Sequence, residues 1–393
     1  MRQIGIVFTF LLLSFLTGCW SNQELNHSTL VHGVGFDTKD DQLRIALEIV
    51  QPSSNGSGSE DVESQGSGEH IILEEDTDTL LEGARELIKY TKRRLDFGHT
   101  KVWIITEDLA KEDFISTLGL IRRDQMLRLN SHIFITKDNP TDILNTPTMY
   151  EHLVASELDS SLNQTQYVAE YAPITMREFY KLIEGPIPNA YIPMLYLEEV
   201  NKQKVTALDG VAVIKKDRMV GELDRTETAG LNILLNHVKG GNIQVNLNDE
   251  EKISLEIATL KTKLNPTLNG SKVDVAIQVE MEGTLADNMT PRKINESFLK
   301  EIETALEEKI EATTLATLNT LQEDLQTDIT NIGLKTYRKY PRQWKKISSK
   351  WDEIFAGAEV SIEVDTNVLH QGLINESVNR HKTPHNNPYR FSK

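Results

Sequence analysis

The feature that most constrains this chain is its only cysteine, Cys19, which directly follows an uncharged apolar segment. One cysteine in 393 residues excludes an intramolecular disulfide and a zinc site built from several cysteines. The fold must therefore be stable without covalent cross-links. The apolar segment, residues 4–16, is shorter than the ~20 residues that a membrane-spanning helix needs. Behind the cation of Arg2, it matches the apolar region of a secretory signal peptide, which is about 7–15 residues long.

The residues around Cys19 indicate lipid attachment. Leu16-Thr17-Gly18-Cys19 places a small residue before the cysteine, which suits the signal peptidase of lipoproteins. We expect residues 1–18 to be the signal peptide and Cys19 to carry a diacylglyceryl group. Two acyl chains anchor a protein stably, so the expected location is the outer face of the cell membrane. The alternatives are an ordinary signal peptide with a chance cysteine and a short membrane anchor.

The rest of the chain is acidic and contains no second long apolar segment. The formal net charge is −17, and 39% of the residues are hydrophobic, which suffices for a packed core. This charge argues against nonspecific nucleic-acid binding, because such binding needs clustered cations that face phosphates. The length favours two or three domains, at about 150 residues each.

Residues 19–140 are predicted to form an N-terminal mixed α/β domain, because strands alternate with helices. Strands are expected at 29–37, 42–50, 71–73, 101–106 and 132–136. Helices are expected after Thr77 or Asp78, either of which can cap the first one, and over residues 114–121. Residues 53–68 hold one aliphatic side chain among Ser, Gly and acidic residues, so they are predicted to form a flexible loop.

Residues 141–205 are assigned to a small middle domain or connector. The pattern over 148–180 is helical, and Thr148 and Thr175 are candidate capping residues. Three prolines, Pro186, Pro188 and Pro193, interrupt the segment that follows.

Residues 206–376 are predicted to form a C-terminal α/β domain in which a long helix packs on an antiparallel sheet. A hairpin is expected at 208–223, and then a helix over 226–238 that ends at Gly240-Gly241. Strands follow at 243–247, 253–264, 272–282 and 360–368, and the long helix covers roughly 294–330. A coiled coil is the alternative for this helix, but its apolar spacing is not a sustained heptad. The overall fold class is α+β, and residues 377–393 are predicted to be a disordered tail.

The sequence contains no recognisable catalytic or metal-binding pattern. It has no Gly-rich phosphate loop, no His-Glu-x-x-His helix and no Gly-x-Ser-x-Gly elbow. The only close histidine pair, His381 and His385, lies in the polar tail. We therefore expect a protein that is not an enzyme and that holds neither a metal nor a cofactor.

One basic cluster stands out against the acidic background. Its cations alternate with aromatic residues, and the whole cluster comprises Lys335, Tyr337, Arg338, Lys339, Tyr340, Arg342, Trp344, Lys345, Lys346, Lys350 and Trp351. One interpretation is a surface that contacts a partner or anionic lipid, with Lys339, Arg342, Lys345 and Lys346 as contact residues. Each cation near such lipid contributes about 1 kcal/mol. The interpretation that the pattern favours is a helix with its aromatic residues in the core and its cations solvated.

Ordered short motifs resemble the Ger(x)C family, the lipoprotein C subunits of spore germinant receptors. In the N-terminal half they are Cys19-Trp20-Ser21-Asn22-Gln23-Glu24-Leu25-Asn26, Val34-Gly35-Phe36-Asp37, Leu95-Asp96-Phe97-Gly98-His99, and the arginines and asparagine within 122–130. In the C-terminal half they lie at 210–213, 221–223, 227–231, 238–241, 340–344, 351–352 and 372–373. The resemblance covers about residues 16–376 and departs from the family at 53–68 and in the tail.

The resemblance implies three mixed α/β domains and no known catalytic activity. It also implies a complex with multi-pass A and B subunits in the inner membrane of a dormant spore. In that family the receptor starts germination when nutrients arrive, and an accessory or scaffolding role is implied for the C subunit. The alternative is a substrate-binding lipoprotein of a membrane transporter. That class has two doubly wound lobes, and the antiparallel strands expected over 208–282 argue against it. An extracytoplasmic hydrolase is a third possibility, weakened by the missing nucleophile or metal pattern.

Overall fold

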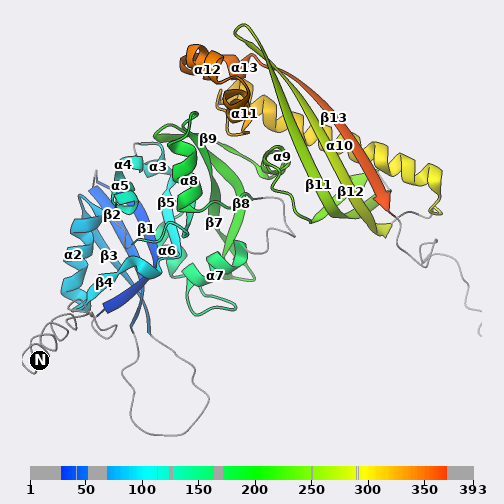
Figure 1. Cartoon of the computed structure of the whole chain (residues 1–393). Helices are drawn as coiled ribbons and strands as arrows, with labels where there is room; N and C mark the ends of the chain where they lie inside the picture. The colour runs from blue at the N-terminus through cyan, green and yellow to red at the C-terminus, as the bar shows by residue number, and fades with distance from the viewer. Residues whose placement is uncertain are drawn as a thin grey trace, which may run out of the picture.

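The computed structural model contains two β-sheets, which helices join into an elongated molecule (Figure 1). It describes residues 28–40, 42–51, 69–112, 114–123, 127–162, 171–248, 251–288, 290 and 292–369. Cys19 and the segments predicted to be a loop at 53–68 and a tail at 377–393 lie outside the described residues. Helices and both kinds of strand pairing occur together, which confirms the α+β class.

The first sheet has nine strands, in the order β3-β2-β1-β5-β6-β7-β8-β9, with β4 beside β1. They are β1 (Ser28–Lys39), β2 (Gln42–Gln51), β3 (Glu69–Thr77), β4 (Arg94–Asp96), β5 (Val102–Thr106), β6 (His132–Thr136), β7 (Asn189–Val200), β8 (Gln203–Lys215) and β9 (Arg218–Leu223). Neighbours among β1, β5, β6 and β7 pair in parallel, whereas β2, β3, β8 and β9 pair antiparallel. The sheet is therefore mixed, with a parallel centre.

Helices cover both faces of this centre. Leu87, Phe114 and Phe179 pack on the face of Trp103, whereas Ile143 and Leu158 pack on the opposite face. The helices of the two layers are α2 (Leu80–Thr91), α3 (Glu107–Ala110), α4 (Phe114–Thr117), α5 (Gly119–Arg123) and α8 (Met176–Ile183) on one side, and α6 (Pro140–Leu144) and α7 (Val154–Ser161) on the other. Parallel strands buried on both faces need continuous apolar runs, and all five residues of β5 are buried.

The borders predicted near residues 140 and 205 do not coincide with a border of this sheet. Strand β7 comes from the segment assigned to a middle domain, yet it pairs with β6 through Ile135 and Met194. The hairpin predicted at 208–223 forms as β8 and β9, but these strands extend the first sheet rather than the C-terminal one. Apolar strands can join any sheet that buries them, so their place along the chain did not reveal which sheet they enter.

The ends of four helices show where capping was predicted well and where it was not. Thr175 caps α8 in a reciprocal capping box with Glu178, as expected. Helix α2 is capped by Thr79, whose hydroxyl accepts a hydrogen bond from the Glu82 amide, and not by Thr77 or Asp78. Helix α7 begins after Leu153, so the predicted cap at Thr148 is wrong. Helix α9 (Arg225–Leu235) ends earlier than predicted, at Asn236 in a left-handed conformation rather than at the two glycines.

The second sheet has the order β10-β11-β12-β13. Its strands are β10 (Asn242–Asn246), β11 (Lys252–Asn269), β12 (Lys272–Asn288) and β13 (Glu359–Leu369). The first three pair antiparallel, but β13 pairs in parallel with β12. The prediction of a wholly antiparallel sheet is therefore corrected at this edge. Between β12 and β13 the chain forms α10 and three short helices, and this crossover returns β13 in the same direction as β12.

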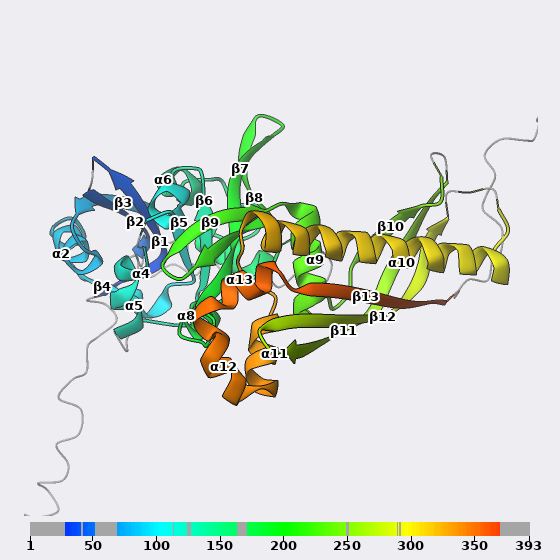
Figure 2. The same ribbon diagram turned by 90° about the horizontal axis from the view of Figure 1, so that it is seen from above.

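Helix α10 (Glu296–Asn319) packs across one face of this sheet (Figures 1 and 2). Ile302, Leu306 and Ile310 are fully buried on the helix, and the alternate valines and isoleucine of β12 are buried beneath it. The helix ends earlier than predicted, in a π-helical turn at Thr320–Asp324. The opposite sheet face carries exposed charged residues such as Lys263 and Glu280, which form an ion pair of 2.6 Å.

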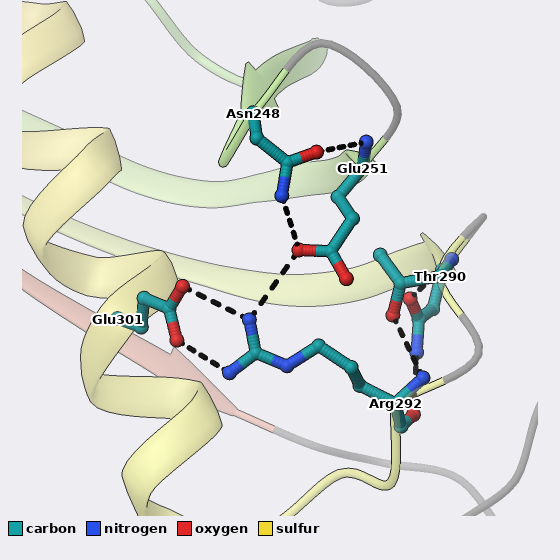
Figure 3. A network of polar contacts seen from close by, with 6 residues as sticks. Asn248, Glu251, Thr290, Arg292 and Glu301 are labelled. Carbon is teal, nitrogen blue, oxygen red and sulfur yellow. Dashed lines mark hydrogen bonds and ion pairs between the residues drawn. The ribbon is translucent and has the colours of Figure 1, made fainter.

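An arginine-centred network fixes the start of α10 to the far end of the second sheet (Figure 3). The Arg292 guanidinium donates to the Glu301 carboxylate on α10 and lies 3.4 Å from the Glu251 carboxylate before β11. Asn248 donates to the same Glu251 carboxylate at 2.8 Å. The guanidinium also lies 4.2 Å from the centre of the Phe298 ring. The network therefore ties the helix start, the turn before β11 and the aromatic core together.

Candidate contact surface

The predicted aromatic–basic stretch folds into three short helices at the junction of the two sheets (Figures 1 and 2). They are α11 (Ile332–Lys339), α12 (Pro341–Ile347) and α13 (Trp351–Ala356), with a 3-10 turn at Ser348–Lys350. The single continuous helix predicted here is therefore wrong. Pro341 begins a new helix because proline fits the first helical position but cannot donate a backbone hydrogen bond inside one.

The two tryptophans of the stretch belong to the core. Trp344 and Trp351 are only 5% and 3% exposed, and their ring centres lie 4.9 Å apart. Tyr337 packs edge-on against Trp344, with ring centres 5.9 Å apart. Aromatic pairs in such tilted arrangements contribute about 0.5–1.5 kcal/mol beyond the area that they bury. The stack gives the surface above it a rigid base.

A buried carboxylate, Asp328, holds this base in place. One of its oxygens accepts hydrogen bonds from the Gly333 amide at 2.7 Å and from the Trp351 indole at 3.0 Å. The other oxygen accepts from the amide and the hydroxyl of Thr330, at 2.9 and 2.8 Å. Burial raises the pKa of Asp328, and these hydrogen bonds oppose the rise. A buried carboxylate needs such partners to offset its desolvation.

The same segment connects the two sheets. The side-chain amide of Asn189, at the start of β7, donates a hydrogen bond to the backbone carbonyl of Asp328 at 3.3 Å. The Lys215 ammonium, at the end of β8, donates to the Gln326 carbonyl at 2.8 Å and lies 3.1 Å from the Asp352 carboxylate. Close packing at Gly333 adds to this: a Cβ there would lie 2.2 Å from Ile187 and 2.6 Å from the indole of Trp351.

The cations of the stretch lie outside this core. Of the predicted contact residues, Arg342, Lys345 and Lys346 are exposed on α12. Lys339 is also exposed, but its ammonium donates to the Pro266 carbonyl of β11 at 2.9 Å and lies 5.4 Å from the centre of the Tyr340 ring. Lys339 therefore ends α11 and is partly engaged by the protein itself, whereas the other three cations lie on the next helix, α12.

A cavity of about 270 Å³ lies beside this segment, between α8 and α11. Lys181 and Leu182 of α8 line one side, and Asp328, Leu334 and Arg338 line the other. The cavity combines apolar walls with two cations. We call α11, α12 and this cavity the junction surface.

Sequence reasoning missed Asp328 and Gly333, which organise the junction surface. The spacing of Asp328 and Thr330 is typical of a local turn in which the carboxylate accepts from the residue two positions on. That signal could have indicated the turn, but not its burial or its bond to Trp351, which lies 23 positions away. No cluster of three or more metal-ligating side chains is found in the described part of the chain. None of the described helices combines the length and apolarity needed to cross a bilayer.

Comparison with known proteins places this architecture among spore germination proteins. Residues 21–197 match the spore germination protein N-terminal domain, and residues 209–372 match the C-terminal domain described as spore germination B3/GerAC-like. The chain belongs to the Ger(x)C family of germinant-receptor proteins, which confirms the family resemblance.

Individual relatives match along nearly their whole length. Spore germination protein YndF of Bacillus subtilis (strain 168) is 23% identical over 95% of this chain and 98% of its own. Spore germination protein B3 of the same organism is 24% identical over 93% and 97%. The crystal structure of the GerBC protein matches 86% of this chain and 97% of its own, with a TM-score of 0.55 and 20% identity. The family supports a role in spore germination and is not a known enzyme family. The transporter-type alternative is not favoured, because the described strands do not form two doubly wound lobes.

Proposed function

We propose that this protein is the lipid-anchored C subunit of a nutrient germinant receptor, acting by contact with the membrane-embedded A and B subunits. The observation that carries this proposal is the match of both family domains along the chain. The Leu16-Thr17-Gly18-Cys19 motif supports the anchor on the outer face of the spore inner membrane. The family supports a role of this protein in spore germination. We infer the contacts with the A and B subunits.

The junction surface is the region that we propose for partner contact. Its cations Arg342, Lys345 and Lys346 lie on α12, the helix that Trp344 anchors in the core. Little side-chain packing must therefore be reorganised when a partner binds. Pre-organisation of this kind lowers the free-energy cost of association. In a chain with a net charge of −17, this local positive surface also selects an acidic partner region.

The test is charge reversal by the double substitution Lys345→Glu and Lys346→Glu in spores. We expect germination and co-purification of the membrane subunits to fall, while the melting temperature stays nearly unchanged because both residues are exposed. A matched control is Lys202→Glu with Lys204→Glu, which reverses two exposed lysines at the β7–β8 turn, away from α12 (Figure 2). Full germination by the α12 variant would remove the junction surface from the proposal.

The anchor is tested separately by Cys19→Ala. We expect this variant to leave the membrane fraction, because no acyl chains would remain to hold it. Membrane retention that resists salt washing would contradict lipid attachment at Cys19.

A further inference from the structure

A second basic surface lies on the first sheet, at α2 and β4, and neither the family match nor the junction surface accounts for it. Two large apolar side chains of α2, Leu81 and Ile88, are 47% and 37% exposed. They lie seven positions apart and therefore share one flank of α2 with Arg85, and Lys92 directly follows the helix as its C-terminal cap. All four side chains are exposed. The flank thus combines apolar and cationic groups, as interfacial helices do.

The end of α2 concentrates positive charge. Lys89, Lys92, Arg93 and Arg94 fall within six positions, and Lys92 ends the helix in a left-handed conformation. Lys89 is paired with Glu86. Between α2 and the following β4 lies a groove of about 310 Å³, lined mainly by apolar side chains that include Leu81, Ile88 and Phe97. We call α2, β4 and this groove the α2 surface.

The α2 surface lies beside Ser28, the first described residue of the chain. Strand β4 pairs with the very start of β1, through Ser28 and Arg94. Nine positions separate Cys19 from Ser28, and an extended chain of that length spans at most about 32 Å. In both views α2 and β4 lie far from α11 and α12 (Figures 1 and 2). A lipid on Cys19 would therefore hold the α2 surface, and not the junction surface, nearest the bilayer.

We propose that the α2 surface docks on an anionic lipid bilayer, with its cations at the headgroups and Leu81 and Ile88 in the interface. The inference rests on the proposed lipid anchor for its orientation, but the lipid contact is a property of the folded surface. Docking by this face leaves the junction surface uncovered by lipid, so that it stays accessible to the part of a membrane subunit that projects from the bilayer. The α2 surface would then bind lipid, and the junction surface would bind a protein partner.

The experiment measures binding of residues 19–393, carrying Cys19→Ser, to phosphatidylglycerol and to phosphatidylcholine vesicles at low salt. All described residues lie within this span. We expect salt-sensitive binding to phosphatidylglycerol only. The double substitution Lys92→Glu and Arg93→Glu should lower the partition coefficient at least about tenfold, since each cation near anionic lipid contributes about 1 kcal/mol. The matched control, Lys202→Glu with Lys204→Glu at the β7–β8 turn, changes the net charge by the same amount at two exposed lysines and should lower the partition coefficient less than threefold. Melting temperatures of both variants check that they remain folded.

Two results would overturn the proposal. One is equal loss in both variants, which would reveal attraction to net charge alone. The other is no binding of the parent chain to phosphatidylglycerol at low salt. Because Cys19→Ser carries no lipid, neither result depends on the anchor, which membrane fractionation of Cys19→Ala tests independently.

Discussion

The two sheets bury their strands in different ways, although one apolar core extends through both. In the first sheet, β5 is buried at every position because helices cover both faces. In the second sheet, β12 alternates buried and exposed residues because α10 covers only one face. Every side chain of a central strand such as β5 therefore contributes to the packed core of the first sheet. In the second sheet, every other position of β12 faces outward and can carry a charged side chain. A substitution should thus be more costly in the first sheet than at an outward position of the second.

The largest expected effect is that of Trp103→Ala in β5. The Trp103 ring is fully buried, stacks on Phe36 with ring centres 6.1 Å apart and donates to the Ser131 hydroxyl at 2.7 Å. We expect a loss of about 3–5 kcal/mol in the free energy of unfolding, measured by guanidinium titration. Gln278→Ala, on the exposed face of β12, should change it by less than about 0.5 kcal/mol. Equal losses would contradict the contrast between the sheets.

A polar residue inside the first sheet provides the next test. Glu48 on β2 has no exposed area, and its two carboxylate oxygens accept from the amides of Val154 and Ala155 at 2.7 and 2.9 Å. It caps α7 from another element, since the helix's own Leu153 provides no side-chain cap. Glu48→Ala should leave these amides unpaired and destabilise the protein by about 1–3 kcal/mol. Thermal unfolding measures the loss, and Glu280→Ala, on the exposed face of the second sheet, is the control that should stay near the parent.

Gly333→Ala tests whether the sheets are coupled through the junction. The new methyl group would overlap Ile187 and Trp351, and overpacking of this kind costs about 1–3 kcal/mol. Denaturation followed by tryptophan fluorescence and by far-UV circular dichroism should show that both probes shift together. If the two probes give different unfolding transitions in the parent chain, the two sheets unfold independently, as two separate units.

The smallest expected effect is a pH dependence that belongs to the first sheet. A hydrogen bond to Glu48 raises the pKa of His70 above 6.5, and the two side chains lie 3.1 Å apart. A raised folded-state pKa means that the contribution of His70 is fully present below pH 6.5 and is lost as the pH rises through the folded value. His70→Gln should therefore lower the melting temperature at pH 6 more than at pH 8.5. A difference from the parent that is equal at both pH values would exclude this ion pair as a source of stability.

Local signals in the sequence predicted most helices and strands. The predictions failed where contacts between residues far apart along the chain determine the structure. The alternation in β12 and the apolar stripe of α10 were readable because they follow fixed periods of two and about 3.6 residues. The capping box at Thr175 was readable because its two partners are three positions apart. The cap of α7 was not, because Glu48 lies 106 positions from Val154. The entry of β8 and β9 into the first sheet was equally hidden, since apolar strands carry no mark of the sheet that accepts them.

The sequence by itself determined the lone cysteine behind an apolar run, the ordered family motifs and the basic character of the segment from Lys335 to Lys350. These are properties of composition and spacing, which folding does not alter. Only the tertiary structure decided that Trp351 is core and bonded to Asp328, and that Lys345 and Lys346 are exposed beside it. It also decided that the cations at the end of α2 lie beside the first strand, apart from the basic segment at the junction (Figure 1). Burial and separation of this kind arise from contacts between residues far apart along the chain, and no local pattern records them.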